Sequence, residues 1–318
     1  MSLAAGGAVA LAAALDRTLA EPPARVHPVA WLGRVVAALD TRLPDSRMSG
    51  IFLTLTLPVA FALALALPVA VIGAIAPIPW GFTAVLAGVA LFVCSSHRML
   101  IAEATAVVSL SVDDPAAARH RLRSLAGRDP TALCPEQIRS AAVESAAENL
   151  ADGLLAPYLA FAVGVIVAGA LAVSTHVALA AGVAGAGLMK GINTLDSMLG
   201  YHDRRTGWAP ARADDVAMWI PARVAAGTIA LVSGPRAAAA VIGRAGASAR
   251  EPSSPNSGWP MATVASAGRM RLEKPGAYTL FPEHPLPTPG AAMAGVRLVS
   301  RAAWVGVAGV ASVVVILT

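Results

Sequence analysis

Residues 154–189 form a run of 36 residues without one Asp, Glu, Lys or Arg. As a single straight helix this run would extend about 54 Å at 1.5 Å per residue, whereas the hydrocarbon core of a bilayer is about 30 Å thick. We therefore expect either two elements with a break near Ser174-Thr175-His176, or one long helix that leaves the membrane. Both alternatives place the run in or beside a membrane.

The rest of the chain is similarly apolar. Of its 318 residues 56% are hydrophobic and 14% are charged, whereas charged residues make up about 25% of an ordinary soluble domain. We predict an all-α, polytopic integral membrane protein with about four to six transmembrane or re-entrant helices. The other candidate spans are Ile51–Ala76, Trp80–Ser96, Ala302–Leu317 and, more weakly, Met1–Leu15 and Ile220–Ile242.

The basic residues indicate an orientation. They gather in the polar segments 16–50, 97–153, 189–221 and 244–301, which the positive-inside rule assigns to the cytoplasmic side of the cell membrane. If Ile220–Ile242 crossed the membrane, residues 244–301 would change sides, so we expect that segment to lie at the interface or to re-enter.

These assignments give a domain organisation. We predict one membrane-embedded domain over residues 1–318, with a helical cytoplasmic insert at 97–153 and cytoplasmic motif loops at 189–221 and 244–301. The net charge is +5, but only 5% of residues are aromatic and no basic stripe with interleaved aromatic residues occurs. Nucleic acid is therefore not an expected partner.

Three acidic residues precede the long apolar run. Glu144, Glu148 and Asp152 are spaced i, i+4, i+8, which on a helix puts neighbouring carboxylates about 6 Å apart on one face. Like charges at that spacing repel, and a divalent cation such as Mg²⁺, which takes oxygen ligands, would remove the repulsion. The alternative is a solvated acidic helix face, and the spacing alone leaves both interpretations open.

A second polar cluster follows the apolar run. Lys190, Asn193 and Asp196 share one helical face. Several arginines follow in the sequence, and the planar guanidinium group of arginine is suited to binding phosphate. The cluster continues with Arg204, Arg205, Arg212, Asp214, Asp215 and Arg223. A basic cluster that touches anionic lipid would explain the arginines, but not the neighbouring carboxylates and Asn193.

Two smaller motifs remain. Ser254, Asn256 and Ser257 lie in a loop rich in Ser, Pro and Gly, which could donate hydrogen bonds to an anion or could simply be a turn. His27 could act as a base or a ligand, although a lone histidine is more often a hydrogen-bonded structural residue.

Together these clusters resemble the CobD/CbiB family, adenosylcobinamide-phosphate synthase, a membrane protein family of cobalamin biosynthesis. The resemblance covers nearly the whole chain. It rests on Asp16-Arg17 with His27-Pro28 and Gly33, Glu144-Ser-Ala-Ala-Glu148-Asn149 with Asp152-Gly153, residues 190–201, Gly207-Trp208 with Asp214-Asp215 and residues 220–223, and residues 254–260. Many members carry an acidic residue after the Trp-Pro pair, where this chain has Met261, so no carboxylate role is expected there.

The resemblance implies an activity. Members join the propionate carboxylate of adenosylcobyric acid to the amine of (R)-1-amino-2-propanol or its O-phosphate, and this amide formation implies activation by ATP with Mg²⁺ as cofactor. The expected partners are these substrates, membrane lipid and other cobalamin-assembly enzymes at the membrane, with the active site facing the cytoplasm.

The implied chemistry assigns roles to the clusters. Glu144, Glu148 and Asp152, with Asp196, are the predicted Mg²⁺ ligands. Lys190 and Asn193 are predicted catalytic residues together with Asp214 or Asp215 as the general base. The predicted substrate- and phosphate-binding residues are Lys190, Arg204, Arg205, Arg212, Arg223, His27, Ser254, Asn256 and Ser257.

Two other classes of function remain as alternatives. Secondary transporters also place charged residues beside broken apolar helices, but usually at the bilayer midplane between inverted repeats, and no repeat is visible here. A non-catalytic anchor for soluble cobalamin enzymes would leave the acidic residues unexplained.

Overall fold

The computed structural model describes residues 1–318 except 20, 76–78, 128 and 202. Within these residues the chain is helical apart from one two-stranded antiparallel hairpin, β1 (Leu272–Lys274) and β2 (Tyr278–Leu280). Six helical stretches are long and apolar enough to cross a membrane, or seven if α10 and α11 together form one broken span. The prediction of an all-α polytopic membrane protein is thus confirmed.

The residues group into two compact units, one built from three separate segments of the chain and the other from two. The first unit comprises Met1–Ser96, Asp152–Met218 and Val307–Thr318, and the second comprises His97–Ala151 and Trp219–Gly306. The predicted insert at 97–153 therefore falls almost wholly in the second unit. The prediction of a single domain stays a prediction.

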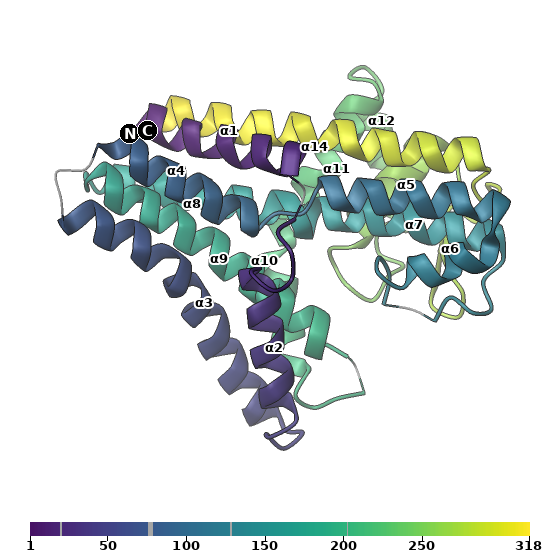
Figure 1. Ribbon diagram of the computed structural model, residues 1–318. Helices are drawn as coiled ribbons and strands as arrows, with labels where there is room; N and C mark the ends of the chain where they lie inside the picture. The colour runs from purple at the N-terminus through teal and green to yellow at the C-terminus, as the bar shows by residue number, and fades with distance from the viewer. Residues whose placement is uncertain (20, 76–78, 128, 202) are drawn as a thin grey trace. The chain divides into compact units, whose positions relative to one another are not determined.

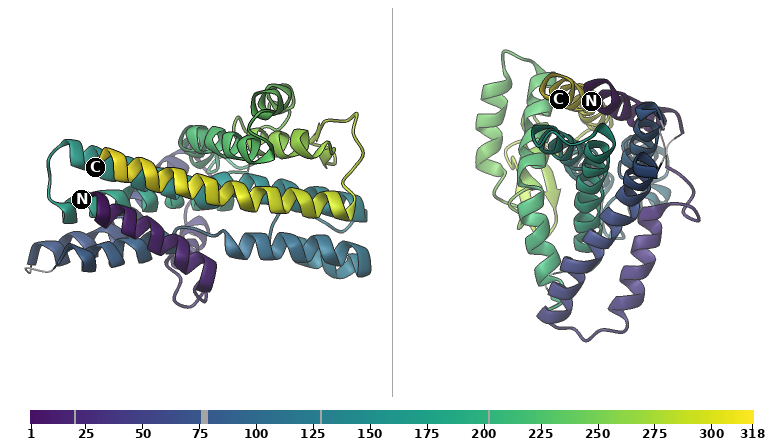
Figure 2. Two further views of the ribbon diagram at one scale, coloured as in Figure 1. Left: turned by 90° about the horizontal axis from the view of Figure 1, so that it is seen from above. Right: turned by 90° about the vertical axis from the view of Figure 1, so that its left-hand side faces the viewer.

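The first unit contains three of the six candidate spans whole and a part of each of the other three. Its helices are α1 (Ser2–Leu19), α2 (Pro28–Asp40), α3 (Arg47–Ile75), α4 (Trp80–Val93), α8 (Ala156–Ala170), α9 (Thr175–Leu199), α10 (Trp208–Ala217) and the end of α14 (Pro289–Leu317). Helix α9 packs along both α3 and α8 (Figure 1). Figure 1 and Figure 2 show α2 and α3 joined by a short loop. Leu32, Leu53 and Leu195 form part of the buried core of this unit.

Helices α3 and α9 approach closely because of a glycine. A Cβ on Gly191 would lie 2.7 Å from the Cα of Pro58, a distance that side-chain atoms do not tolerate. Gly191 therefore lets the backbone of α9 lie against α3 directly after Lys190. This packing fixes the position of Lys190 in the first unit.

The second unit carries the hairpin and shorter helices. Its helices are α5 (Arg98–Asp113), α6 (Pro115–Leu122), α7 (Pro135–Asn149), α11 (Trp219–Ser233), α12 (Ala238–Ser248), α13 (Gly258–Gly268) and the first part of α14. Helix α7 packs on α5, on α13 and on strand β1, and α13 also packs on α11 and α12.

The long charge-free run is broken where the sequence predicts. Helix α8 ends at Ala170 and α9 begins at Thr175. Ser174 caps α9, since its side chain accepts a hydrogen bond from the Val177 N–H, as N-cap serines commonly do. The run therefore forms two elements, which confirms the first of the two alternatives.

The segment Ile220–Ile242 is not one continuous span. Helix α11 ends at Ser233, and Gly234 follows with φ = +152°, a backbone angle that favours glycine. Pro235 comes next and α12 begins only at Ala238. The expectation that this segment lies at the interface or re-enters stays a prediction, because α10 and α11 together could also form one broken span. The last residue of the predicted span Ile51–Ala76 lies outside the described residues.

A π-helical turn, η1 (Leu150–Leu155), joins α7 to α8. Its cause is visible in the sequence, because Pro157 has no N–H to donate to the carbonyl of Gly153. That carbonyl instead accepts a hydrogen bond from the Ser96 N–H at 3.0 Å. Turns of this kind occur often at functional sites.

Candidate functional site

Lys190 is a partly buried cation in the first unit. It lies on α9 one residue before the close approach of α9 to α3. In the described part of the chain its ammonium group forms no ion pair and no hydrogen bond. Its positive charge acts on His27: burial is the main cause of the lowered pKa of that imidazole, and the charge of Lys190 lowers it further. The structure thus brings together two predicted site residues that are far apart in the sequence.

His27 caps helix α2. Its Nδ1 accepts a hydrogen bond from the Val29 N–H at 3.2 Å, and its Nε2 lies 3.8 Å from Oε2 of Glu21. Burial lowers the pKa of His27 below its ordinary value of 6.5; Lys190 adds to this, and Glu21 opposes it. A neutral imidazole with Nδ1 as acceptor is therefore the form that the fold favours, so His27 suits a structural role better than phosphate binding.

Arg204 is held by a carboxylate. Its Nη1 and Nη2 donate to the two oxygens of Asp40 at 2.9 and 2.7 Å, the paired geometry that makes arginine–carboxylate contacts strong. Asp40 raises the pKa of the Arg204 guanidinium. This arginine joins the loop before α10 to α2, and both of its terminal nitrogens already donate to Asp40.

The neighbouring residues are anchored by Asp45. Its Oδ1 accepts hydrogen bonds from the backbone N–H and the hydroxyl of Thr206, both at 2.9 Å. These bonds lower the pKa of the Asp45 carboxyl below its usual range. The Arg205 backbone N–H donates to the same carboxylate at 3.3 Å, while the Arg205 side chain is exposed. In the described residues that guanidinium has no partner, so Arg205 can bind an anion.

Helix α10 carries the two aspartates predicted as general base. Arg212 donates to Oδ2 of Asp215 at 3.1 Å, one helical turn along. Trp208 is the first residue of the same helix. The guanidinium of Arg47, from α3, lies 5.2 Å from the centre of its ring, which is a cation–π contact. Arg212 and Asp215 therefore neutralise one another, and Asp214 lies beside them in the sequence.

In the second unit, Glu144 is only 1% exposed. Its Oε1 accepts a hydrogen bond from the Ser140 hydroxyl at 2.6 Å, and its Oε2 accepts one from the Tyr278 hydroxyl at 2.7 Å. The Ser140 hydroxyl in turn accepts from the backbone N–H of Glu273 in β1 at 2.8 Å. The sulfur of Met261 lies 3.6 Å from the Tyr278 hydroxyl. Glu144 thus fastens the hairpin to α7.

Arg223 connects two of the sequence motifs. Its Nη1 donates to Oδ1 of Asn256 at 2.6 Å, and its Nη2 donates to the carbonyl of Pro255 at 3.2 Å. The guanidinium lies 4.6 Å from the ring centre of Trp219 and 5.3 Å from that of Trp259. The predicted phosphate ligands Arg223 and Asn256 therefore bind one another. Ser254 stays within the same loop, where its hydroxyl accepts from the backbone N–H of Asn256 and of Ser257.

The predicted magnesium ligands do not assemble into a ready-made metal site. Among the described residues, no group of three or more His, Cys, Asp or Glu side chains could hold a metal ion. Both oxygens of Glu144 accept hydrogen bonds from the protein. Asp152 lies in the π-helical turn η1, so the regular i+4 step ends at Glu148. The hydrogen bonds give Glu144 a structural role, and the roles of Glu144, Glu148, Asp152 and Asp196 as metal ligands stay predictions.

The sequence analysis missed some of these contacts. Tyr278 and Ser140, which bind Glu144, carried no local signal apart from the i+4 spacing of Ser140 and Glu144. Asp40 and Asp45, which bind the loop after α9, are about 160 residues away in the sequence. Asn193 lies one turn after Lys190, where its carbonyl accepts from the Ser197 hydroxyl.

Comparison with known proteins identifies the family. The family model described as CobD/Cbib protein matches residues 9–304. The "Probable cobalamin biosynthesis protein CobD" of Methanothermobacter thermautotrophicus is 37% identical over 278 residues, which cover 85% of this chain and 84% of that protein. The "Cobalamin biosynthesis protein CobD" of Klebsiella pneumoniae is 34% identical over 286 residues, covering 83% and 81%.

A third relative agrees with these two. The "Cobalamin biosynthesis protein CobD" of Rhodobacter capsulatus is 35% identical over 271 residues, covering 79% of this chain and 75% of that protein. No solved structure matches the chain. The sequence motifs, the helical membrane fold and these relatives agree, and the chain belongs to the CobD/CbiB family of cobalamin biosynthesis proteins.

Proposed function

We propose that this protein forms an amide bond in an ATP-dependent reaction. The carboxylate would come from adenosylcobyric acid and the amine from (R)-1-amino-2-propanol or its O-phosphate. The observation that carries the proposal is the family match over residues 9–304, which makes a role in cobalamin biosynthesis secure. The ligase chemistry itself is our inference.

The proposed reaction needs an activated acyl group, because a carboxylate and an ammonium ion do not condense unaided in water. A carboxylate oxygen attacks the γ-phosphorus of ATP, the bond to the β-phosphate oxygen breaks, and ADP leaves. The amine nitrogen then attacks the acyl carbon of the resulting acyl phosphate, and inorganic phosphate leaves with the electron pair of the broken C–O bond. Asp214 or Asp215 takes the first proton from the ammonium ion before the attack, and the second proton that the nitrogen loses leaves with the inorganic phosphate.

The pairing of the basic residues supports a division of roles. Arg204, Arg212 and Arg223 are held by Asp40, Asp215 and Asn256, respectively. Lys190 and Arg205 form no such contact within the described residues. We therefore assign phosphate binding first to Lys190 and Arg205. Phosphoryl transfer also calls for Mg²⁺, and Glu148, Asp152 and Asp196 are each a candidate carboxylate ligand.

The test uses detergent-purified protein with adenosylcobyric acid, aminopropanol phosphate, ATP and Mg²⁺, with corrinoid products followed by mass. We expect an amide product that requires ATP, Mg²⁺ and both substrates. Lys190→Gln should reduce turnover strongly, whereas Arg236→Gln, which removes an exposed charge elsewhere, should not. Corrinoid binding without turnover, in protein shown to be folded, would overturn the proposal and favour a transporter or an anchor, which uptake into liposomes would distinguish.

A further inference from the structure

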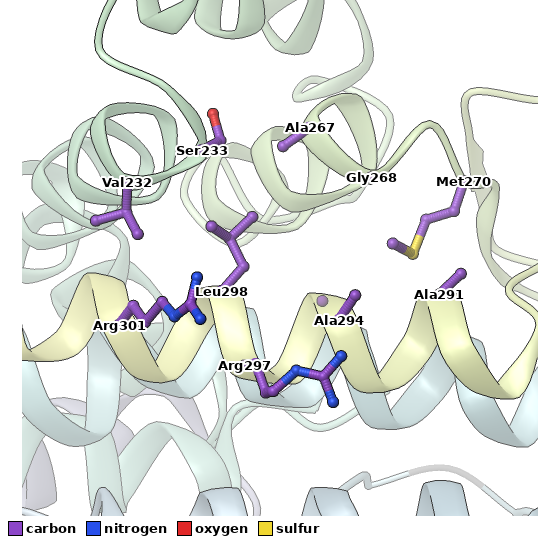
Figure 3. A pocket seen from close by; sticks show the side chains of 11 residues that line it. Val232, Ser233, Ala267, Gly268, Met270, Ala291, Ala294, Arg297, Leu298 and Arg301 are labelled. Carbon is purple, nitrogen blue, oxygen red and sulfur yellow. The ribbon is translucent and has the colours of Figure 1, made fainter.

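A cavity of about 390 Å³ lies in the second unit, between the end of α11, the end of α13 and the first part of α14 (Figure 3). Its walls include Val232, Met270 and Leu298, which are apolar, and the small residue Ala294. Arg297 and Arg301 of α14 complete the lining. None of these residues is one of the predicted site residues.

The two arginines form an unbalanced pair of charges. They are four residues apart on one helix, where like charges repel. Both side chains are exposed, and within the described residues neither forms an ion pair or a hydrogen bond. An anion bound between the two guanidinium groups would remove the repulsion, and arginine forks suit phosphate oxygens in particular.

The position of the arginines along α14 indicates where such an anion comes from. Residues 302–317, which follow Arg301, contain no charged side chain. At 1.5 Å per residue they extend about 24 Å, most of the thickness of a bilayer core of about 30 Å. Arg301 is thus the first charge beyond the apolar stretch, and Arg297 lies one turn further out. When this stretch is in the membrane, both arginines lie at the level of lipid headgroups.

We propose that this cavity binds the phosphate headgroup of an anionic membrane phospholipid. Arg297 and Arg301 contact the phosphate, and Val232, Leu298 and Met270 contact the glycerol and the first methylene groups. The cavity volume fits a headgroup with its glycerol, since small-molecule sites measure about 300–1,000 Å³. A headgroup with a compensating positive charge, such as phosphocholine, binds more weakly because its ammonium repels the arginines.

Binding is tested with protein reconstituted in nanodiscs that contain equal amounts of phosphatidylglycerol and phosphatidylcholine. The protein is then released into detergent, and native mass spectrometry counts the retained lipids. We expect retention of phosphatidylglycerol over phosphatidylcholine. The double variant Arg297→Gln/Arg301→Gln should lower the ratio of retained phosphatidylglycerol to retained phosphatidylcholine. The expected decrease is about fivefold for each charge removed, as for arginines near an anionic surface. This readout is independent of the proposed enzymatic activity.

Two further variants separate a site from general charge attraction. Arg236→Gln/Arg250→Gln removes the same charge from exposed positions of the same unit and should leave the ratio unchanged. Ala294→Phe keeps both arginines but fills the cavity from an exposed position, and it should lower retention of phosphatidylglycerol. Thermal unfolding of each variant confirms that it is folded.

Three outcomes would overturn the proposal. The first is equal retention of the two lipids by the unaltered protein, and the second is an equal loss in both double variants. The third is displacement of phosphatidylglycerol by millimolar inorganic phosphate together with no effect of Ala294→Phe, which would show a site for soluble phosphate instead. A selective loss in Arg297→Gln/Arg301→Gln and in Ala294→Phe supports it.

Discussion

The hydroxyl of Tyr278 donates a hydrogen bond of 2.7 Å to the carboxylate of Glu144, which lies 134 residues earlier in the chain. Glu144 is buried, and its other oxygen accepts a hydrogen bond from Ser140. A buried carboxylate is costly unless it is hydrogen-bonded. The contact therefore gives Glu144 a structural explanation that needs no metal ion.

Removal of the Tyr278 hydroxyl should destabilise the second unit. Tyr278→Phe removes the hydrogen bond of this donor to the buried Oε2 of Glu144, and a hydrogen bond to a charged group contributes about 1.5–3 kcal/mol. We expect a lower melting temperature in detergent, measured by thermal unfolding. Tyr201→Phe is the matched control, because Tyr201 is 54% exposed and its loss should change little. Equal melting temperatures for the two variants would contradict the structural role of Tyr278.

Glu144 and Glu148 should respond differently to the same substitution. Glu144→Gln disturbs the hydrogen bonds to Ser140 and Tyr278, so we expect lower stability by about 1 kcal/mol. Glu148→Gln should abolish the proposed Mg²⁺-dependent turnover in protein that is still folded. Both variants are measured by thermal unfolding and by product formation over a range of Mg²⁺ concentrations. A Glu144→Gln protein of unchanged stability that needs more Mg²⁺ would instead make Glu144 a metal ligand.

The membrane fold could be predicted from the sequence because bilayer thickness is a strict constraint. The charge-free run at 154–189 is too long for one span, and the break predicted near Ser174 occurs there. The π-helical turn also had a signal, since Pro157 cannot donate to the Gly153 carbonyl. Its effect on the position of Asp152, which lies within the turn, has no signal in the residue spacing.

The site was less predictable because its contacts are distant in the sequence. Residue types and spacing located the polar clusters, but they could not show which cations already have partners. Arg204 meets Asp40 across 164 residues, and Arg223 meets Asn256 across 33. No periodic pattern encodes such pairs. The sequence therefore predicts where the polar residues gather. The structure distinguishes the arginines that bind protein side chains from Lys190 and Arg205, which form no such contact within the described residues.

His27 should make stability depend on pH. The unfolded chain takes up this proton near pH 6.5, whereas burial lowers the pKa in the folded protein. The free energy of unfolding should therefore fall as pH drops below about 6.5 and level off below the folded pKa, by at most about 1.4 kcal/mol per pH unit. His27→Asn can still cap α2 but does not titrate. We expect a shallower fall of its melting temperature between pH 7.5 and 5.

The control for this experiment is His120→Asn, because His120 is exposed. Its melting temperatures should follow those of the unaltered protein at every pH. If His27→Asn showed the same pH dependence as His120→Asn, protonation of His27 would not limit stability.

Substitution of Arg204 should lower stability, whereas substitution of Lys190 should weaken ATP binding. Arg204→Gln removes the paired contact with Asp40 and should cost about 1 kcal/mol of stability, since both side chains are partly exposed. The stability effects of Arg204→Gln and Asp40→Asn should be non-additive, as for residues in contact. Lys190→Gln should instead raise the KM for ATP with little change in melting temperature. The reverse pattern would make Arg204 the phosphate ligand.

Arg223 should hold the loop that contains Asn256 in place. Its guanidinium bonds to Asn256 and Pro255 and lies against Trp219 and Trp259. Arg223→Lys keeps the charge but loses the planar fork, so amide hydrogen exchange over residues 253–258 should become faster. Asn256→Ala should have a similar effect, and the double variant should add little, because each substitution breaks the same contact.

Arg244→Lys is the control for this series, since Arg244 in α12 contacts Ser266 rather than the loop. Faster exchange confined to residues 253–258 in Arg223→Lys would show that the arginine organises the loop. Unchanged exchange there, with a raised KM for ATP, would show that Arg223 leaves Asn256 to bind phosphate. The two roles predict different observables because an arginine held by Asn256 stabilises the loop whether or not substrate is present.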